Sequence, residues 1–556
     1  MNLESFPVGS SLILISTSPT TLPLDAQSVA IKQALLSLPN TITGLDPTRE
    51  FLLYTGTVVY NGSLSGTVTL PYSDLDGDGF VDGSTPLLAV TALQPYTLVN
   101  GRWEQVNGPV VRDTIRQTIS FNVSHFSIYT LNGPMSYPVL NSVRVSPNPF
   151  KPNSGNPDEG VPYSAGNSNS GIIFDNLTDK VKIEIYTIAG QLVAKLSSDS
   201  SGGKLQWNAK NESGRDVASG GYIALITSPG QSHAVKKILI VRYISMKHLS
   251  LVGIIIIALC GARPCAAVSS AGGEPFNFLF LDANARAVGM GGAYTALAVD
   301  GNALLYNPAG LGLIANHEVT FMHNQYFENI TQEYFGLAVP SGWGASLNYL
   351  NFGDVPKTTI SNPSGTGLGR AGMADMAFSV GYGRAISDSL SVGMGVKLIK
   401  ESIDNVSVNA FAMDMGVLYS LLDTPKLTLG LAVQNLGPAV KYQHADENLP
   451  LNLRAGAAYS FIFLDRKSIA SIDIAKERSD KALQNFGVEI LVVKTVPVRL
   501  GFNTRNNAGS GFSAGLGWIH KNFNFDYAIV PYGDIGITHR ISLAYIWGRS
   551  VAYDNR

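Results

Sequence analysis

The stretch Leu390–Leu398, LSVGMGVKL, alternates strictly between large apolar side chains and small or polar ones. Successive side chains of a β-strand point to opposite faces, so this alternation places all the large apolar side chains on one face. Lys397 is the one charged residue of the stretch, and it falls on the other face. The pattern predicts a strand with one fully apolar side.

Five further stretches repeat this alternation: 427–434, 451–461, 512–518, 523–529 and 541–547. Across the six stretches the apolar face carries no Lys, Arg, Asp or Glu, whereas the opposite face includes Lys397, Arg454 and Asp526. A soluble β-sandwich also alternates, but its outer face is expected to carry charges. Because a basic side chain facing lipid at the bilayer midplane costs roughly 2–4 kcal/mol, the pattern favours transmembrane β-strands.

The composition points the same way. Charged residues make up 14% of the chain, against roughly 25% in soluble proteins. No uninterrupted apolar run reaches the roughly 20 residues that a spanning helix needs, and a closed barrel is the other structure that satisfies its backbone in lipid. We therefore expect an all-β protein in which residues 317–556 form an outer-membrane β-barrel of about fourteen strands, an even number as in bacterial barrels. The net charge of −2 gives no basic field for nucleic acid.

The connections between the candidate strands alternate between long and short along the chain. Long connections at 353–372 and 437–450 alternate with tight ones at 387–388 and 520–521. Outer-membrane barrels have longer extracellular loops and short periplasmic turns, so we expect the two kinds at opposite ends of the barrel.

Residues 268–316 lie ahead of the first strand, and within them 282–312 is too rich in Gly and Ala for a spanning strand and predicts short helices and turns. Three motifs occur there: AVGMGGA at 287–293, DGNA at 300–303 and NPAG at 307–310. They resemble the N-terminal signature of the PorV/PorQ-type outer-membrane proteins, which are related to FadL-like fatty-acid channels. The resemblance implies a fourteen-stranded barrel with these residues as a hatch in its lumen. The motif residues are Gly289, Gly291, Gly292, Asn302, Asn307, Pro308 and Gly310. Packing of the hatch is the first interpretation of their role, and ligand contact is the alternative.

Residues 138–243 predict a second β-rich domain, opened by VSPNPF at 145–150. Trp207, Gly214 and the run 218–222 (ASGGY) follow at a spacing that resembles the FlgD-like immunoglobulin-like domain. That domain is similar to the C-terminal sorting tails of type IX secretion cargo. Trp207 and Tyr222 are expected in its core.

Residues 1–135 predict a further β-sandwich with one helix near 26–38. It contains an Asp-rich loop whose candidate calcium ligands are Asp74, Asp76, Asp78, Phe80 (through its carbonyl) and Asp82. Alternating carboxylates next to a Gly turn provide oxygen ligands suited to Ca²⁺. Thr85 stands where an EF-hand loop has a bidentate Glu. A structural Ca²⁺ site and an ion-free polar turn both remain open.

Residues 246–267 have the form of a secretory signal peptide. A basic start at 246–248 precedes an apolar stretch at 249–262 and small residues near Cys265. An internal signal peptide divides the chain into the end of one exported protein and a complete second one. Two joined reading frames and a genuine fusion are both compatible with this arrangement.

We expect no enzyme. The sequence Gly511–Gly515 (GFSAG) fits the nucleophile-elbow pattern, but that motif needs a strand–turn–helix and here lies in an alternating strand. The predicted function is a PorV/PorQ-like component of a type IX-like secretion pathway, in contact with outer-membrane lipid. Its expected partners are exported proteins with immunoglobulin-like C-terminal domains and other secretion components. Residues 1–245 are then periplasmic or on the cell surface. The alternative is a FadL-like channel for small hydrophobic molecules, which an apolar pocket beside the hatch would favour and a polar lumen would not.

Overall fold

The computed structural model confirms the all-β class. None of the described helices is long and apolar enough to cross a membrane. The structure describes residues 2–3, 11–16, 49–55, 58–59, 66–77, 79, 81–82, 90–99, 102–106, 108–124, 128–132, 139–199, 203–243, 271–421, 427–442, 445–478 and 480–548. The expected signal peptide at 246–267 and the expected helix at 26–38 lie outside these residues.

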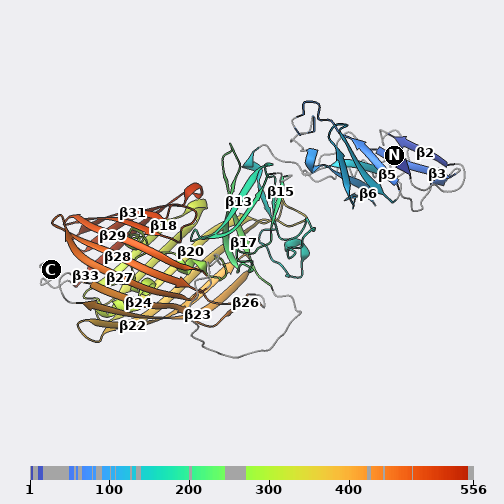
Figure 1. The fold of residues 1–556 in the computed structure, drawn as a ribbon. Coiled ribbons are helices and arrows are strands. Elements are labelled where there is room, and N and C mark those ends of the chain that lie inside the picture. Colours follow the sequence, from blue (N-terminus) through green and yellow to red (C-terminus); the bar gives the residue numbers. More distant parts are fainter. Residues whose placement is uncertain are drawn as a thin grey trace, which may run out of the picture.

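Fourteen antiparallel strands form one closed barrel, because the last strand pairs with the first (Figure 1). Its strands are β18 (His317–Gln325), β19 (Thr331–Ala338), β20 (Trp343–Pro356), β21 (Arg370–Ala385), β22 (Leu390–Ile403), β23 (Val406–Leu421), β24 (Leu427–Leu436), β27 (Asn452–Phe463), β28 (Arg466–Glu477), β29 (Ala482–Val493), β30 (Val496–Asn503), β31 (Phe512–His520), β32 (Phe523–Pro531) and β33 (Ile537–Trp547). A hairpin of β25 (Val440–Tyr442) and β26 (Ala445–Glu447) interrupts the order between β24 and β27. The strand number agrees with the sequence expectation.

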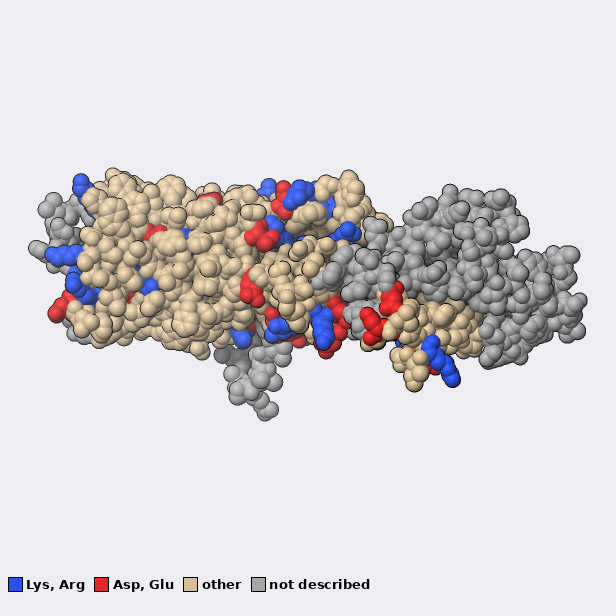
Figure 2. All heavy atoms as spheres, turned by 90° about the horizontal axis from the view of Figure 1, so that it is seen from above, with Lys and Arg blue, Asp and Glu red and all other residues tan. Residues whose placement is uncertain are grey.

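The side chains of the barrel strands divide into an apolar exterior and a polar interior. Leu398 and Leu431 are each 60% exposed on the outside, whereas Lys397 and Arg454 are buried on the inside. Figure 2 shows few Lys, Arg, Asp or Glu side chains over the middle of the visible barrel wall, with more of them toward its two ends. An exterior of this kind is what a lipid bilayer requires of a barrel.

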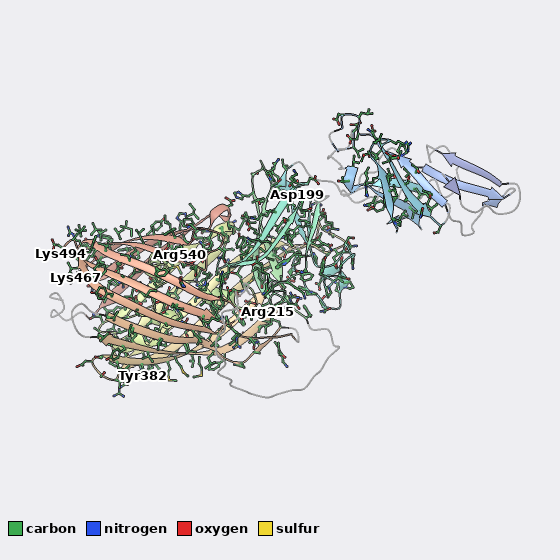
Figure 3. The ribbon with its side chains drawn as sticks, viewed as in Figure 1. Asp199, Arg215, Tyr382, Lys467, Lys494 and Arg540 are labelled. Carbon is green, nitrogen blue, oxygen red and sulfur yellow. The ribbon has the colours of Figure 1, made fainter. Side chains whose placement is uncertain are left out.

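The connections lie where the sequence placed them. The long segments 357–369 and 437–451 leave the barrel at one end, which we call the mouth. The two-residue turns 464–465, 494–495 and 521–522 lie at the other end, near Lys467 and Lys494 (Figure 3). Because outer-membrane barrels carry their longer loops outside the cell, we expect the mouth to be the extracellular end.

Two β-rich regions precede the barrel. Residues 139–243, here called the middle domain, contain one sheet of β11 (Arg144–Ser146), β12 (Ile172–Asp175) and β15 (Lys204–Trp207). Its second sheet has the order β14 (Leu192–Ser198), β13 (Val181–Thr187), β16 (Gly220–Thr227) and β17 (Ala234–Ile240). Trp207 and Tyr222 meet edge to face in its core with their ring centroids 6.0 Å apart.

The N-terminal region forms two further sheets. One has the order β1 (Asn2–Leu3), β5 (Gly66–Pro71), β9 (Thr118–Val123) and β8 (Val110–Asp113). The other has the order β2 (Ser11–Ser16), β3 (Arg49–Thr55), β10 (Ile128–Asn132), β6 (Gln94–Val99) and β7 (Arg102–Gln105), with β4 (Val58–Val59) paired to β3.

Candidate functional site

The segment between residue 271 and β18 fills the barrel lumen. It forms short helices: η4 (Asn277–Phe280), α2 (Ala285–Gly289), α3 (Ala303–Tyr306) and η5 (Pro308–Leu313). Inward-facing serines of the wall bind its backbone. Ser391 donates to the carbonyl of Ala309 at 2.7 Å, and Ser513 donates to the carbonyl of Val288 at 2.7 Å. Ser513 belongs to the GFSAG stretch and serves here as a hydrogen-bond donor to the hatch.

Glycines allow the hatch backbone to touch the wall. Gly291 has a φ of +65°, and a Cβ there would lie 2.6 Å from the Phe486 carbonyl oxygen. A Cβ on Gly310 would lie 1.6 Å from the Ala298 carbonyl oxygen, within the hatch itself. Glycine is also needed on the wall side of the contact, because a Cβ on Gly416 would meet the side chain of Asn307. Side chains at Gly291 or Gly416 would hold the hatch away from the strands, and one at Gly310 would disrupt the hatch itself.

The remaining motif residues shape the turns of the hatch. The Asn307 side chain accepts from the Ala309 amide at 3.1 Å and donates to the carbonyls of Thr295 and Val417, each at 3.1 Å. Pro308 follows as the first residue of η5. Gly289 and Gly292 pack closely against neighbouring residues inside the lumen. Asn302 is the N-cap residue of α3. All seven motif residues are buried in the lumen.

Buried charges fix the hatch to the wall at two places. Asp473 of β28 accepts from the amides of Tyr294 and Thr295 at 3.2 and 3.0 Å, and from the Thr295 hydroxyl. The same carboxylate pairs with Arg454 of β27 at 2.7 Å. These charges converge on the hatch from two neighbouring strands.

The second place is a chain of four charges. Arg286 of the hatch pairs with Glu489 at 2.8 Å, Glu489 pairs with Arg499 at 2.6 Å, and Arg499 pairs with Asp526 at 2.6 Å. Arg454 and Asp526 were recognised from the sequence as inward-facing. Asp473, Arg286, Glu489 and Arg499 were missed, although β28, β29 and β30 show the same alternation.

The middle domain sits on the mouth of the barrel. Tyr186, Ile188 and Ile223 of this domain share one buried apolar cluster with barrel residues that include Phe352 and Tyr532. A Cβ on Gly221 would lie 2.8 Å from the Phe352 ring, so glycine is needed for this contact. The backbones also pair across the junction, because Asn148 and Thr358 exchange amide-to-carbonyl hydrogen bonds of 3.1 and 2.9 Å.

Charged side chains are buried at the same junction. Lys151 of the middle domain is 3% exposed, and its ammonium pairs with Asp404 of the β22–β23 turn at 2.8 Å. Burial alone would lower the pKa of Lys151, but Asp404 more than offsets it, so the pKa lies above its usual value. Glu447 of β26 accepts from the Ser219 amide at 3.0 Å and from its hydroxyl at 2.8 Å. Burial raises the pKa of Glu447 to about 7 although these hydrogen bonds oppose the shift.

The candidate calcium loop is only partly described. Asp78 and Phe80 lie outside the described residues. The Asp82 carboxylate accepts from the Leu75 amide at 2.8 Å and the Ser73 hydroxyl at 2.7 Å, and these bonds lower its pKa. Over the part of the chain that the structure describes, no three metal-binding side chains gather. Calcium therefore stays a prediction.

Residues 269–478 match a family model described as "Type IX secretion system protein PorV". The match covers less than half of the chain. A curated relative, the UPF0164 protein of Treponema pallidum (strain Nichols), is 27% identical over 178 residues, which are 29% of this chain. The chain spans 44% of the length of that relative.

Solved barrels are also similar. The CymD monoaromatic hydrocarbon channel has 10% identity and a TM-score of 0.34, covering 48% of this chain and 98% of that one. The Ralstonia pickettii toluene transporter TbuX has 12% identity and a TM-score of 0.32, with the same coverage. A Pseudomonas aeruginosa FadL homologue has 11% identity and a TM-score of 0.31, covering 47% of this chain and 98% of that one.

The fourteen-stranded closure, the apolar exterior and the PorV match together identify the C-terminal half as a bacterial outer-membrane β-barrel.

Proposed function

We propose that the barrel is a PorV-type component of a type IX-like secretion pathway, and that its mouth receives exported proteins by binding their immunoglobulin-like C-terminal domains. The observation that carries the proposal is the middle domain itself. A domain whose motifs resemble a sorting tail is seated on the mouth of a barrel whose hatch and first strands match PorV over residues 269–478. The proposal involves no enzymatic step.

The lumen supports secretion over passage of small hydrophobic molecules. The contact between hatch and wall contains the ion pairs Arg454–Asp473 and Arg286–Glu489. An apolar solute placed beside these charges would bury them without offering them any polar contact, which is unfavourable. The hatch thus closes the pore, and the mouth is the surface available to a partner.

The middle domain is assigned in this proposal as FlgD-like and as a sorting domain. Buried Trp207 and Tyr222, and the two glycines that begin β16, Gly220 and Gly221, support the assignment. On this view residues 1–245 lie at the cell surface, held by the contacts at the mouth.

A deletion of residues 246–556 in the native cell tests the function. Surface labelling and fractionation should show proteins with immunoglobulin-like C-terminal domains retained in the periplasm, and restored to the surface when the barrel is supplied from a plasmid. Normal surface display together with slower uptake of hydrophobic compounds would instead establish the channel function.

Intact mass and N-terminal sequencing of the barrel from outer membranes test the proposed signal peptide at 246–267. A product that starts near Val268 means that the sorting domain and the barrel act as separate chains. A product that retains residues 1–245 means a covalent fusion in which the same contacts are intramolecular.

A further inference from the structure

The hairpin between β13 and β14 projects from the middle domain into the mouth. Its turn is closed by two backbone hydrogen bonds, from the Thr187 amide to the Gln191 carbonyl at 2.9 Å and from the Gly190 amide to the Thr187 carbonyl at 3.0 Å. Gly190 has a φ of +82°, a conformation that glycine adopts without strain. The turn therefore presents a Gly-Gln pair to the barrel.

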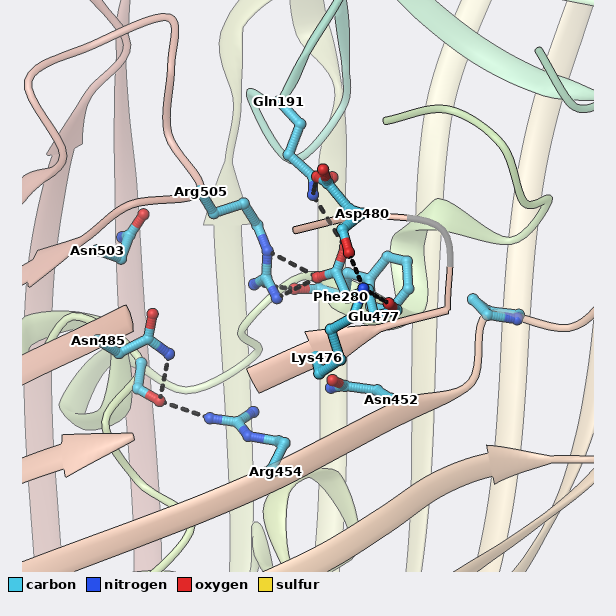
Figure 4. Close-up of polar contacts among 12 residues, drawn as sticks. Gln191, Phe280, Asn452, Arg454, Lys476, Glu477, Asp480, Asn485, Asn503 and Arg505 are labelled. Carbon is cyan, nitrogen blue, oxygen red and sulfur yellow. Dashed lines mark hydrogen bonds and ion pairs between the residues drawn. The ribbon is translucent and has the colours of Figure 1, made fainter. Parts of the chain in front are cut away.

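The Gln191 amide enters a pocket of negative charge. Its nitrogen donates to Glu477 Oε2 and to Asp480 Oδ2, both at 2.9 Å, and the side chain is 2% exposed (Figure 4). Both protons of the amide nitrogen are thus directed at carboxylates, one at the end of β28 and one in the β28–β29 loop. Thr187 donates to the Gln191 side-chain oxygen at 3.4 Å, which fixes the orientation of the amide.

Contacts within the barrel hold the two carboxylates in place. Arg505 pairs with Glu477 at 2.6 Å, and the Lys481 amide donates to the Asp480 carboxylate at 2.8 Å. Lys476 also donates to the backbone carbonyl of Asp480. Arg505 also donates to the Phe280 carbonyl of the hatch at 2.9 Å. Acceptor oxygens held by contacts within the barrel need little further ordering when a domain binds them.

The barrel leaves no room for a side chain at Gly190. Its carbonyl accepts from the amides of Asn507 and Ala508 at 2.9 and 3.3 Å. A Cβ at Gly190 would lie 2.7 Å from the Tyr532 ring and 3.0 Å from the Asn506 side-chain oxygen. Only a residue without a side chain fits between the β30–β31 and β32–β33 loops.

We infer that Glu477, Asp480, Asn507 and Tyr532, here called the socket, select the exported chains that the barrel accepts. The partner is an immunoglobulin-like sorting domain whose first hairpin turn ends in glycine followed by a side chain that donates at least two hydrogen bonds. This inference rests on the proposed function, since it specifies which domains the mouth binds. One turn of the domain thus determines which chains are selected, and the larger apolar contact does not.

The test uses the full chain with a protease site inserted within 244–270, cleaved after purification in detergent. The affinity of the released N-terminal fragment for the barrel is then measured by dilution and size-exclusion chromatography. Gln191→Glu brings a third carboxylate to Glu477 and Asp480 and should weaken binding at least about 30-fold, because like charges brought together in an interface repel each other. Gln191→Lys keeps the donors and should bind within about threefold of the original chain.

The domain supplies its own controls at a second Gly-Gln pair, Gly230–Gln231, in an exposed turn where a Cβ on Gly230 meets nothing within 4 Å. Gln231→Glu should leave affinity unchanged, and Gly230→Ala should weaken it far less than Gly190→Ala, although both glycines have a positive φ. Equal affinities for the Gln191→Glu and Gln231→Glu chains would overturn the socket while leaving the docking function standing. A cleaved original fragment with no measurable affinity would overturn the docking function and the socket together.

Discussion

Removing the carboxylate of Asp473 should release the hatch from the barrel wall. This side chain is 1% exposed and holds the backbone of the hatch at Tyr294 and Thr295 while neutralising Arg454. Asp473→Ala removes these bonds and leaves a buried arginine without its charge partner. Breaking a buried ion pair from one side costs about 3–5 kcal/mol. At about 1.4 kcal/mol for each factor of ten, hatch opening should rise roughly 100- to 4000-fold.

The assay is the labelling rate of a single cysteine at Ala296, a buried hatch position, with a water-soluble maleimide. Cys260 and Cys265, the chain's two cysteines, are replaced by serine. Labelling should accelerate in Asp473→Ala by the stated factor and stay unchanged in Asp465→Asn, a change in an exposed turn. The double variant Asp473→Leu/Arg454→Met removes the unpaired arginine but leaves the Tyr294 and Thr295 amides without their acceptor, so it should recover only part of the protection. Equal labelling of the Asp473→Ala and Asp465→Asn barrels would refute the anchoring role of this carboxylate.

Three further outcomes follow from the same contacts. The pKa of Glu447 in the docked state, about 7, exceeds the ordinary carboxyl value of 4.5, so docking takes up a proton. The contribution of Glu447 to the free energy of docking is complete below pH 4.5 and is lost as the pH rises through 7. The affinity of the cleaved fragment should fall over this range. Glu447→Gln should flatten the dependence of the affinity on pH. Gly291→Ala should lower the stability of the barrel by about 1–3 kcal/mol, because the added Cβ meets the backbone of the wall. Gly367→Ala is the control, since a Cβ there meets nothing within 4 Å. The stability of both variants is compared by heat modifiability on gels. We also propose that loop 74–82 binds Ca²⁺; titration of the full chain should then raise its first unfolding transition, and Asp76→Asn should weaken the effect, whereas no calcium dependence would identify an ion-free turn.

The sequence was sufficient for the barrel because the signal there is local. The alternation at 390–398 became β22, with Lys397 inside and paired with Asp414 at 2.8 Å. Each barrel strand has one side facing lipid, so the alternation within that strand shows which of its side chains point outward. The family resemblance located the hatch motif, and the close approaches of Gly291 and Gly310 give a physical reason for glycine at those positions.

The contacts between distant segments could not be predicted in this way. Gln191 and Glu477 are 286 residues apart, and neither lies in a pattern that specifies a partner. The pairing of Arg454 with Asp473 depends on the register of β27 against β28, which alternation alone leaves open. Docking of the middle domain likewise depends on the shape of the mouth, which only the closed barrel creates.

Closure of the pore and occupation of the mouth are physically connected. Arg505 contacts Glu477 beneath the docked hairpin and the Phe280 carbonyl at the start of the hatch. Tyr222 of the middle domain donates to the Gly272 carbonyl at 3.2 Å, also at the start of this segment. The surface that binds the domain is thus built partly from the hatch, so a barrel with a displaced hatch should bind sorting domains more weakly.

Photo-cross-linking from the mouth in living cells tests the central claim most directly. The barrel is expressed from Met246 with a photoreactive phenylalanine at Tyr532, and the cross-linked proteins are identified by mass spectrometry. The account predicts adducts with exported proteins that carry an immunoglobulin-like C-terminal domain, cross-linked through the first hairpin of that domain. Adducts that lack such a domain, or the absence of adducts while those proteins still reach the surface, would contradict it.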